Sequence, residues 1–174
     1  MLPWRPGRAI HAHMDEDRPP HEVTFQFISE PSTVNYGGKV HGGAVLKWID
    51  QAAYTCARSY AQGYCVTAYL GGTHFKSPIG IGDLVTVHAR VIDTGRTSIH
   101  IAVDVEARSF EDAAFTDKVH CVAVFVHVDE NGRPQPVPPW APRTDAERRA
   151  QAHARRLRAC QVQMDDALRQ EEAE

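Results

Sequence analysis

The sequence has few of the features that mark secreted, fibrous or membrane proteins. Its four cysteines are widely spaced over 174 residues and form no CxxC pair, which argues against a disulfide framework and against a cysteine-based zinc site. No stretch approaches the roughly 20 consecutive apolar residues of a membrane span. The first 20 residues also lack the apolar core of a signal peptide. We therefore expect a cytoplasmic protein with reduced thiols and no membrane association.

The sequence also lacks a strong charge of either sign. Its formal net charge of −3 favours neither nucleic acid nor an anionic membrane surface as a partner. No group of His, Cys and Asp residues has the spacing of metal ligands, so we expect no metal. The content of 43% hydrophobic and 24% charged residues is close to that of ordinary globular domains, and the length predicts one domain with an appendage.

Composition divides the chain into three zones. Residues 1–21 are rich in Pro, Arg, His and acids, which predicts a flexible N-terminal arm. Residues 22–140 hold nearly all of the periodic apolar pattern. Residues 141–174 follow a proline-rich break and predict a C-terminal helical extension, since Thr144 and Glu147 form a capping box before a run without Gly or Pro.

The predicted extension helix has two notable patterns. Leu157, Cys160, Met164 and Leu168 form a narrow apolar stripe at helical spacing. Its arginines precede its acids along the chain, so the two halves of the helix differ in charge. We expect this helix to dock on its own subunit or on a neighbouring one.

The central zone reads as one long helix followed by a meander of strands. Alternating apolar residues mark several of the strands, and Gly95–Arg96 predict a tight hairpin between two of them. The expected elements are strands at 22–27, 65–75, 84–94, 98–109 and 118–129, and a helix at 43–61. Meandering strands imply an antiparallel sheet that the helix must cover, which predicts an α+β fold.

A single carboxylate interrupts the apolar surface of the predicted helix. Asp50 lies among residues that leave the helix little polar surface, and a buried carboxylate is costly unless it is paired, hydrogen-bonded or hydrated. One explanation is an ion pair with Lys47, one turn earlier. The other is a functional carboxylate at the edge of a cleft, suited to general-base catalysis.

A glycine-rich segment precedes the same helix. Residues 35–43 read NYGGKVHGG, and backbone N–H groups at a helix start have no intrahelical acceptor. With the helix dipole they can stabilise a developing oxyanion. Asp50 follows Gly43 by seven residues, which is two turns and about 10 Å along the same face.

Four segments together resemble the hot-dog acyl-CoA thioesterases, in the branch of the broad-specificity acyl-CoA hydrolases. In order they are NYGGKVHGGAVLKWIDQAA, CVTAYLGGTHFKSPIGIGDLV, VIDTGRTSIHIAVDVEA and CVAVFVHVDENGRPQPVPPW. The resemblance covers residues 22–140. It implies a long central helix wrapped by a curved antiparallel sheet of about five strands. It also implies homo-oligomers, tetramers or hexamers, built from dimers whose two sheets join into one.

The resemblance also implies roles for residues at the helix start. Asp50 matches the catalytic carboxylate, which acts either as a general base on water or as a nucleophile on the thioester. Asn35 matches an asparagine that lies across the dimer interface from that carboxylate. Gly42 and Gly43 match the glycines of the helix start, with the Gly43 N–H as the expected oxyanion donor. His41 could polarise the thioester, but we expect mainly structural support from it.

The coenzyme A contacts are implied at a second place in the sequence. Arg96, Thr97 and Ser98 fall in the hairpin that resembles the family's phosphate contact, where a guanidinium and hydroxyls suit phosphate. Arg96 could equally be a solvated hairpin tip. Lys76, near the end of the 65–75 strand, is a further candidate for nucleotide contact.

The function that these patterns favour is hydrolysis of acyl-CoA to a free acid and coenzyme A. This chemistry needs a positioned water, an oxyanion site and a carboxylate, and no cofactor, because coenzyme A is part of the substrate. Two alternatives stay open. One is a non-catalytic acyl-CoA-binding or sensor protein, because a fold alone does not establish catalysis. The other is a hydratase or dehydratase on the same fold, using His41 with Asp50.

Overall fold

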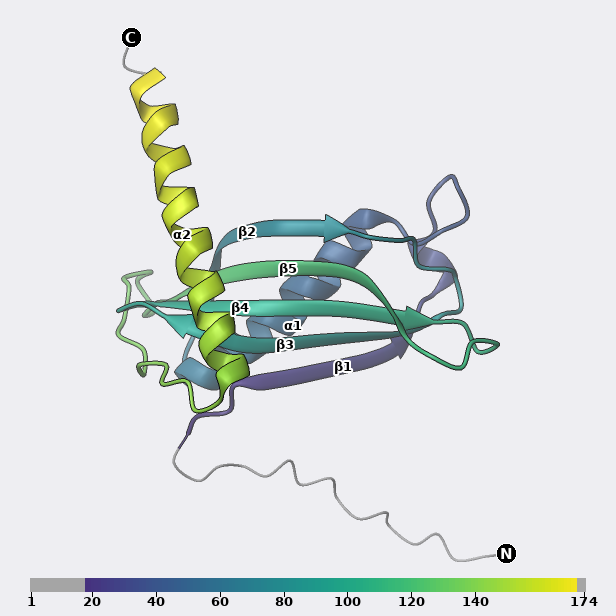
Figure 1. Cartoon of the computed structure of the whole chain (residues 1–174), viewed down its shortest axis with the longest axis horizontal. Coiled ribbons are helices and arrows are strands. Elements are labelled where there is room, and N and C mark those ends of the chain that lie inside the picture. The colour runs from purple at the N-terminus through teal and green to yellow at the C-terminus, as the bar shows by residue number, and fades with distance from the viewer. Residues whose placement is uncertain (1–17, 172–174) are drawn as a thin grey trace, which may run out of the picture.

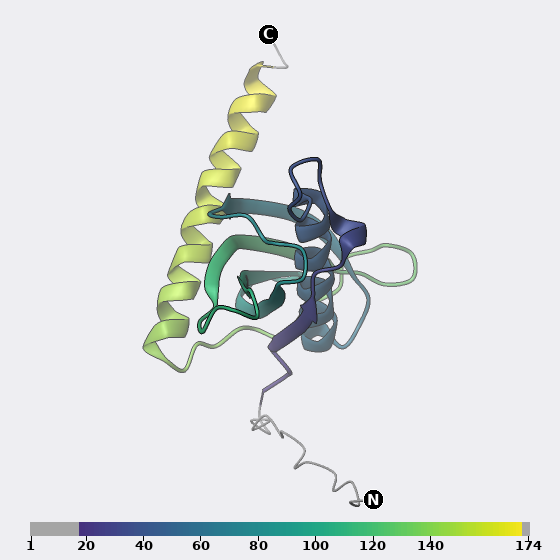
Figure 2. The same cartoon turned by 90° about the vertical axis from the view of Figure 1, so that its right-hand side faces the viewer.

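An antiparallel sheet of five strands wraps around one long helix, and a second helix lies on the other face of the sheet (Figure 1). The computed structural model describes residues 18–171. Its elements are β1 (Glu22–Ile28), a 3-10 turn η1 (Pro31–Thr33), α1 (Gly42–Ala61), β2 (Cys65–Phe75), β3 (Leu84–Thr94), β4 (Ser98–Arg108), β5 (Thr116–His127) and α2 (Asp145–Glu171). These bounds confirm the expected elements to within about two residues, and Figure 2 shows the sheet curving around α1.

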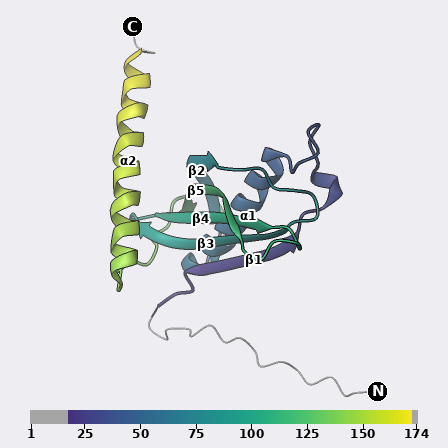
Figure 3. The ribbon, with the colours of Figure 1, turned by 45° about the vertical axis from the view of Figure 1, so that its right-hand side comes forward.

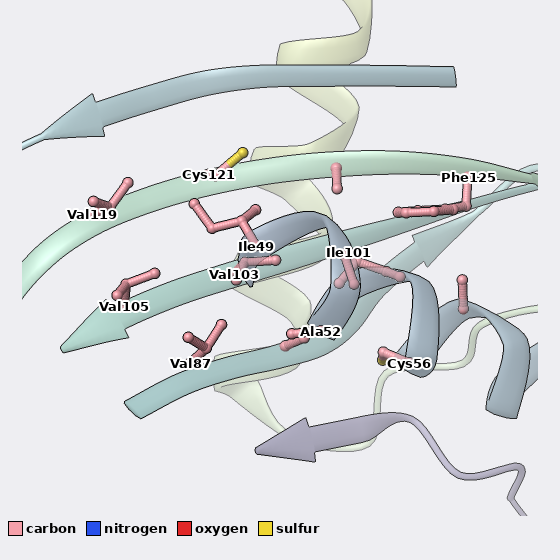
Figure 4. Close-up of a cluster of buried hydrophobic side chains, with 14 of the residues drawn as sticks. Ile49, Ala52, Cys56, Val87, Ile101, Val103, Val105, Val119, Cys121 and Phe125 are labelled. Atoms are coloured by element: carbon pink, nitrogen blue, oxygen red, sulfur yellow. The ribbon is translucent and has the colours of Figure 1, made fainter. Parts of the chain in front are cut away.

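The strands lie in the order β1-β3-β4-β5-β2. Every neighbouring pair is antiparallel. Alternate side chains of the central strands are fully buried against α1, as the period of two requires. Figure 4 shows Ile49 and Ala52 of α1 among Val103, Ile101 and Phe125 of the sheet. These residues form the main core, and they fix the face of α1 that turns away from solvent.

α1 begins and ends at recognisable caps. The ring nitrogen Nδ1 of His41 accepts a hydrogen bond from the Gly43 N–H at 2.8 Å, which satisfies one of the free amides of the first turn. At the other end Gln62 adopts a left-handed conformation with φ of 55° and donates its N–H to the Arg58 carbonyl. α1 therefore has a fixed start beside the glycine-rich loop.

α2 covers part of the outer face of the sheet (Figures 1 and 2). The predicted capping box is present, because Glu147 N–H donates to Thr144 Oγ1 and Thr144 N–H donates to the Glu147 carboxylate, both at 3.1 Å. Ala154 is buried against Ile92, Ala102 and Val122 of the sheet. The first half of α2 is thus fixed to its own subunit.

β1 and β2 are the two edges of the sheet. β2 carries exposed apolar side chains at Val66, Leu70 and Phe75, with Tyr64 just before it. Unpaired strand edges with apolar side chains favour pairing with another chain.

No helix within residues 18–171 is both long enough and apolar enough to cross a membrane. Most of the predicted N-terminal arm, residues 1–17, lies outside the described residues.

Candidate active site

The carboxylate of Asp50 is held by a threonine from the neighbouring strand. Asp50 is half-buried on α1, and its Oδ1 accepts a hydrogen bond of 2.8 Å from Thr67 Oγ1 on β2. Lys47 is exposed, and within residues 18–171 it makes no ion pair with Asp50. The partner of this carboxylate in the structure is therefore Thr67, and the ion pair with Lys47 is not formed.

Thr67 is the residue that sequence reasoning missed. It follows Asp50 by 17 residues, and no local pattern links a strand residue to a helix residue at that separation. The contact arises because β2 returns antiparallel to α1 along the sheet edge. The usable signal was indirect, since a half-buried carboxylate needs a donor and β2 is the next element along the chain.

The two glycine amides at the start of α1 differ in whether they are hydrogen-bonded. The Gly43 N–H, which the sequence predicts as the oxyanion donor, is occupied here by His41 Nδ1. The Gly42 N–H has no acceptor within the described part of the chain. His41 therefore caps the helix, as expected of a structural residue, and its ring is directed at Gly43 and makes no hydrogen bond to Asp50.

Asn35 shapes the loop before α1. Its Oδ1 accepts hydrogen bonds from the Gly37 N–H at 2.8 Å and from the Lys39 N–H at 3.1 Å. Its side-chain amide nitrogen has no partner among residues 18–171. Tyr36 at the tip of this loop is fully exposed. Asn35 thus uses its amide oxygen within the loop and keeps a donor available to another molecule, and it makes no hydrogen bond to Asp50 of its own chain.

The start of α1 and the β3–β4 hairpin lie at opposite ends of the sheet. A methyl group placed on Gly42 would lie 3.8 Å from the Phe75 ring, and Phe75 pairs with Val119 near the start of β5. Ser98, beside Arg96 and Thr97 in the β3–β4 hairpin, pairs with Val126 near the end of β5. Seven residues of strand separate these levels, or about 23 Å. One subunit therefore does not bring the hairpin to its own helix start.

Lys76 lies at the end of the sheet near the helix start. Its ammonium group is 3.0 Å from Oδ2 of Asp117, and both side chains are largely exposed. Surface pairs of this kind are weak, so Lys76 can exchange this partner for a phosphate. Lys76 therefore lies at the opposite end of the sheet from the other predicted coenzyme A contacts, Arg96, Thr97 and Ser98.

The two buried cysteines in α1 and β2 are poor nucleophiles. Burial raises the pKa of the Cys56 thiol to about 12 and that of Cys65 to about 11, so neither is a thiolate at neutral pH. Residues 18–171 also contain no group of three His, Cys, Asp or Glu side chains placed to hold a metal ion.

Comparisons with known proteins relate this chain to thioesterases. The family described as the thioesterase superfamily matches residues 37–114. Protein VdlD of Helicobacter pylori is 32% identical over 126 residues, which are 72% of each chain. An uncharacterized acyl-CoA thioester hydrolase of Zymomonas mobilis is 31% identical over 121 residues, 70% of this chain and 81% of that one.

Solved structures agree with the sequence relatives. An apo hexameric acyl-CoA thioesterase is 30% identical with a TM-score of 0.79, over 83% of this chain and 92% of that one. An acyl-CoA hydrolase from Bacillus cereus is 28% identical with a TM-score of 0.79, over 87% of this chain and 92% of that one. The similarity therefore includes nearly the whole length of those structures.

Proposed function

This chain belongs to the thioesterase superfamily, in the branch of the acyl-CoA thioester hydrolases, and from this premise we propose that it hydrolyses acyl-CoA to a free acid and coenzyme A. The observation that carries the proposal is the Asp50 carboxylate, half-buried at the β2 edge and held by Thr67 at 2.8 Å. A carboxylate fixed by one oxygen leaves the other free to act on water or on the thioester. No cofactor is needed, because coenzyme A leaves as part of the substrate.

Two routes use the same residues. As a general base, Asp50 takes a proton from water while the water oxygen attacks the carbonyl carbon. As a nucleophile, a carboxylate oxygen attacks that carbon and water then cleaves the resulting anhydride. In both routes the carbon–sulfur bond breaks and the thiolate of coenzyme A takes up a proton. Developing charge on the carbonyl oxygen is stabilised by the amide of Gly42, or by that of Gly43 once it leaves His41.

The active unit in this proposal is a dimer joined through β2. Two antiparallel edge strands paired about a two-fold axis bring opposite ends of two subunits together. That pairing places one copy's hairpin, with Arg96, Thr97 and Ser98, near the end where the other copy's α1 begins. It also offers the free amide group of Asn35 to the Asp50 of the second copy. Hexameric relatives support the assembly of three such dimers into a hexamer, and we propose that this assembly is cytoplasmic.

The first test is release of free thiol from acyl-CoAs ranging from acetyl to palmitoyl. Asp50→Ala should lower kcat/KM by at least about 100-fold, the scale of general acid–base catalysis. Lys47→Ala is the matched control, because it changes an exposed residue one turn away on the same helix. If the wild-type protein releases no thiol from any of these substrates, the enzyme assignment fails and binding without turnover becomes the next hypothesis.

A second pair of variants separates the loop role of the Asn35 amide oxygen from the donor role of its amide nitrogen. Asn35→Asp keeps the oxygen that accepts from the Gly37 and Lys39 amides but removes the side-chain donor. Asn35→Ala removes both. If the donor acts on the substrate or on the second copy, both variants lose activity to a similar degree, although only Asn35→Ala disturbs the loop. Full activity in Asn35→Asp would limit Asn35 to a structural role.

A further inference from the structure

α2 is longer than the sheet that it covers. Leu157 lies at the level of the edge strand, because its Cδ1 is 4.0 Å from the position of a Cβ on Gly72 in β2. Residues 158–171 continue past that edge (Figures 1 and 3), over a length of about 21 Å. We call this part of α2 the overhang. It is long enough to cross about four strands of a neighbouring sheet.

The overhang carries apolar side chains that its own subunit leaves exposed. Met164 is 59% exposed and Val162 is 50% exposed, whereas Ala154 on the first half of α2 is 1% exposed. Cys160 is also exposed. Leu157, Cys160 and Met164 are spaced so that they lie along one flank of the helix. The side chain of Leu168, the last residue of the predicted stripe, lies outside the described ones.

The charges of α2 are divided along its length. Residues 148–158 hold five arginines, and residues 159–171 hold Asp165, Asp166 and Glu171 against the single Arg169. Arg149 and Arg156 make no ion pair within the described part of the chain, nor does Asp165. Such a helix is complementary to a second copy of itself that runs in the opposite direction.

We propose that the overhang docks on a second copy of this chain, beside that copy's α2 and antiparallel to it. The proposal rests on the β2–β2 pairing described under the proposed function. A two-fold axis normal to the joined sheet keeps both α2 helices on the outer face and reverses their directions. The basic half of each helix then lies beside the acidic half of the other.

The apolar flank sets the register of this helix pair. In an antiparallel pair with Leu157 opposite the partner copy's Met164, the two-fold axis passes beside Cys160 and Gln161. Each overhang then covers its Met164 against the other copy. The two Cys160 residues face each other near the axis, within the Cα separation of about 4.4–6.8 Å that a disulfide requires. Since Cys160 is the one exposed cysteine among the described residues, a disulfide between two copies of Cys160 would report on the contact.

Oxidative crosslinking tests the contact directly. Mild oxidation of the full-length protein should give a covalent dimer whose yield is independent of protein concentration, and Cys160→Ser should abolish it. The control moves the cysteine to another exposed position of α2, as Cys160→Ser/Ala152→Cys, where the two thiols would lie about 25 Å apart along the helix axes. No covalent dimer from the wild-type protein, or an equal yield from the control, overturns the proposal.

A charge placed in the flank gives a second, independent measurement. Met164→Glu should reduce the crosslinking yield at least about tenfold, whereas Gln163→Glu adds the same charge on a neighbouring exposed position and should leave the yield unchanged. Equal yields in both variants contradict the contact. Asp50→Ala should crosslink like the wild type, so a failure of the proposed hydrolase function is distinguishable from a failure of this contact.

Discussion

Thr67 Oγ1 donates a hydrogen bond of 2.8 Å to Oδ1 of Asp50, and this contact ties the edge strand β2 to the middle of α1. Two consequences follow from its position. The strand that holds the carboxylate also forms the proposed dimer edge, so we expect pairing of two copies to affect the orientation of the carboxylate. The bond also leaves the second carboxylate oxygen available for chemistry.

Removing the Thr67 hydroxyl should slow catalysis without unfolding the protein. Thr67→Val keeps the side-chain volume but leaves the Asp50 carboxylate without its donor, and we expect kcat to fall about tenfold. Thr67→Ser keeps the hydroxyl and should retain most of the activity. The measurement is free-thiol release at saturating substrate. Activity in Thr67→Val equal to that of Thr67→Ser would show that the hydroxyl does not orient the carboxylate.

Replacing His41 with asparagine separates its role as a helix cap from any chemical role of its imidazole. His41→Asn offers another side-chain acceptor to the amides of the first turn, so it should keep both the fold and most of the thioesterase activity. His41→Ala lacks the cap and should lower the free energy of unfolding by about 1 kcal/mol. A large loss of activity in a fully folded His41→Asn would assign chemistry to the imidazole.

The outer face of the sheet should make stability depend on pH in the acid range. Burial raises the pKa of Asp104, but hydrogen bonds of 2.6 Å from both His120 and Arg90 outweigh it and lower the pKa to about 2. Because the folded state lowers this pKa, its stabilisation is complete above about pH 5 and is lost as the pH falls through 4 toward 2.

Asp104→Asn should lower the free energy of unfolding by about 1 kcal/mol at pH 7, a value reduced for solvent screening because a third of the side chain is exposed. Urea unfolding at several pH values should show this difference from the wild type shrinking toward pH 3. Asp117→Asn, in the exposed pair with Lys76, serves as the control and should show little difference at any pH. A constant difference for Asp104→Asn would contradict the assignment.

Arg18 connects the start of the described chain to Trp140 and to Glu147 of α2. Its guanidinium lies 3.7 Å from the centre of the Trp140 ring, and Nη1 is 2.9 Å from Oε1 of Glu147. Only 9% of the Arg18 side chain is exposed, so both contacts are poorly screened. We expect Arg18→Ala to lower the free energy of unfolding by about 1–2 kcal/mol.

Thermal unfolding of Arg18→Ala, Glu147→Gln and the double variant measures how much of this loss belongs to the pair. Losses that simply add would show that Arg18 and Glu147 act independently. Arg18→Lys should recover only part of the stability, because an ammonium group lacks the planar fork of arginine.

The sequence by itself determined the elements and most of their ends. Strand alternation predicted β3 and β4, and the capping box of Thr144 and Glu147 predicted the start of α2, where both hydrogen bonds are present. The seven-residue spacing from Gly43 placed Asp50 two turns along α1. These features depend on residues within one or two turns of each other, so a local pattern is enough to specify them.

Only the tertiary structure decided which groups meet. Lys47, one turn from Asp50, was the local candidate for its partner, yet the donor is Thr67, from a strand whose pairing with β5 is shifted at two places. His41 takes the amide expected for the oxyanion. The register of β4 and β5 separates the Arg96 hairpin from the helix start. These contacts depend on how distant segments pack, and packing is set by the sum of many weak contacts across the core rather than by any short pattern.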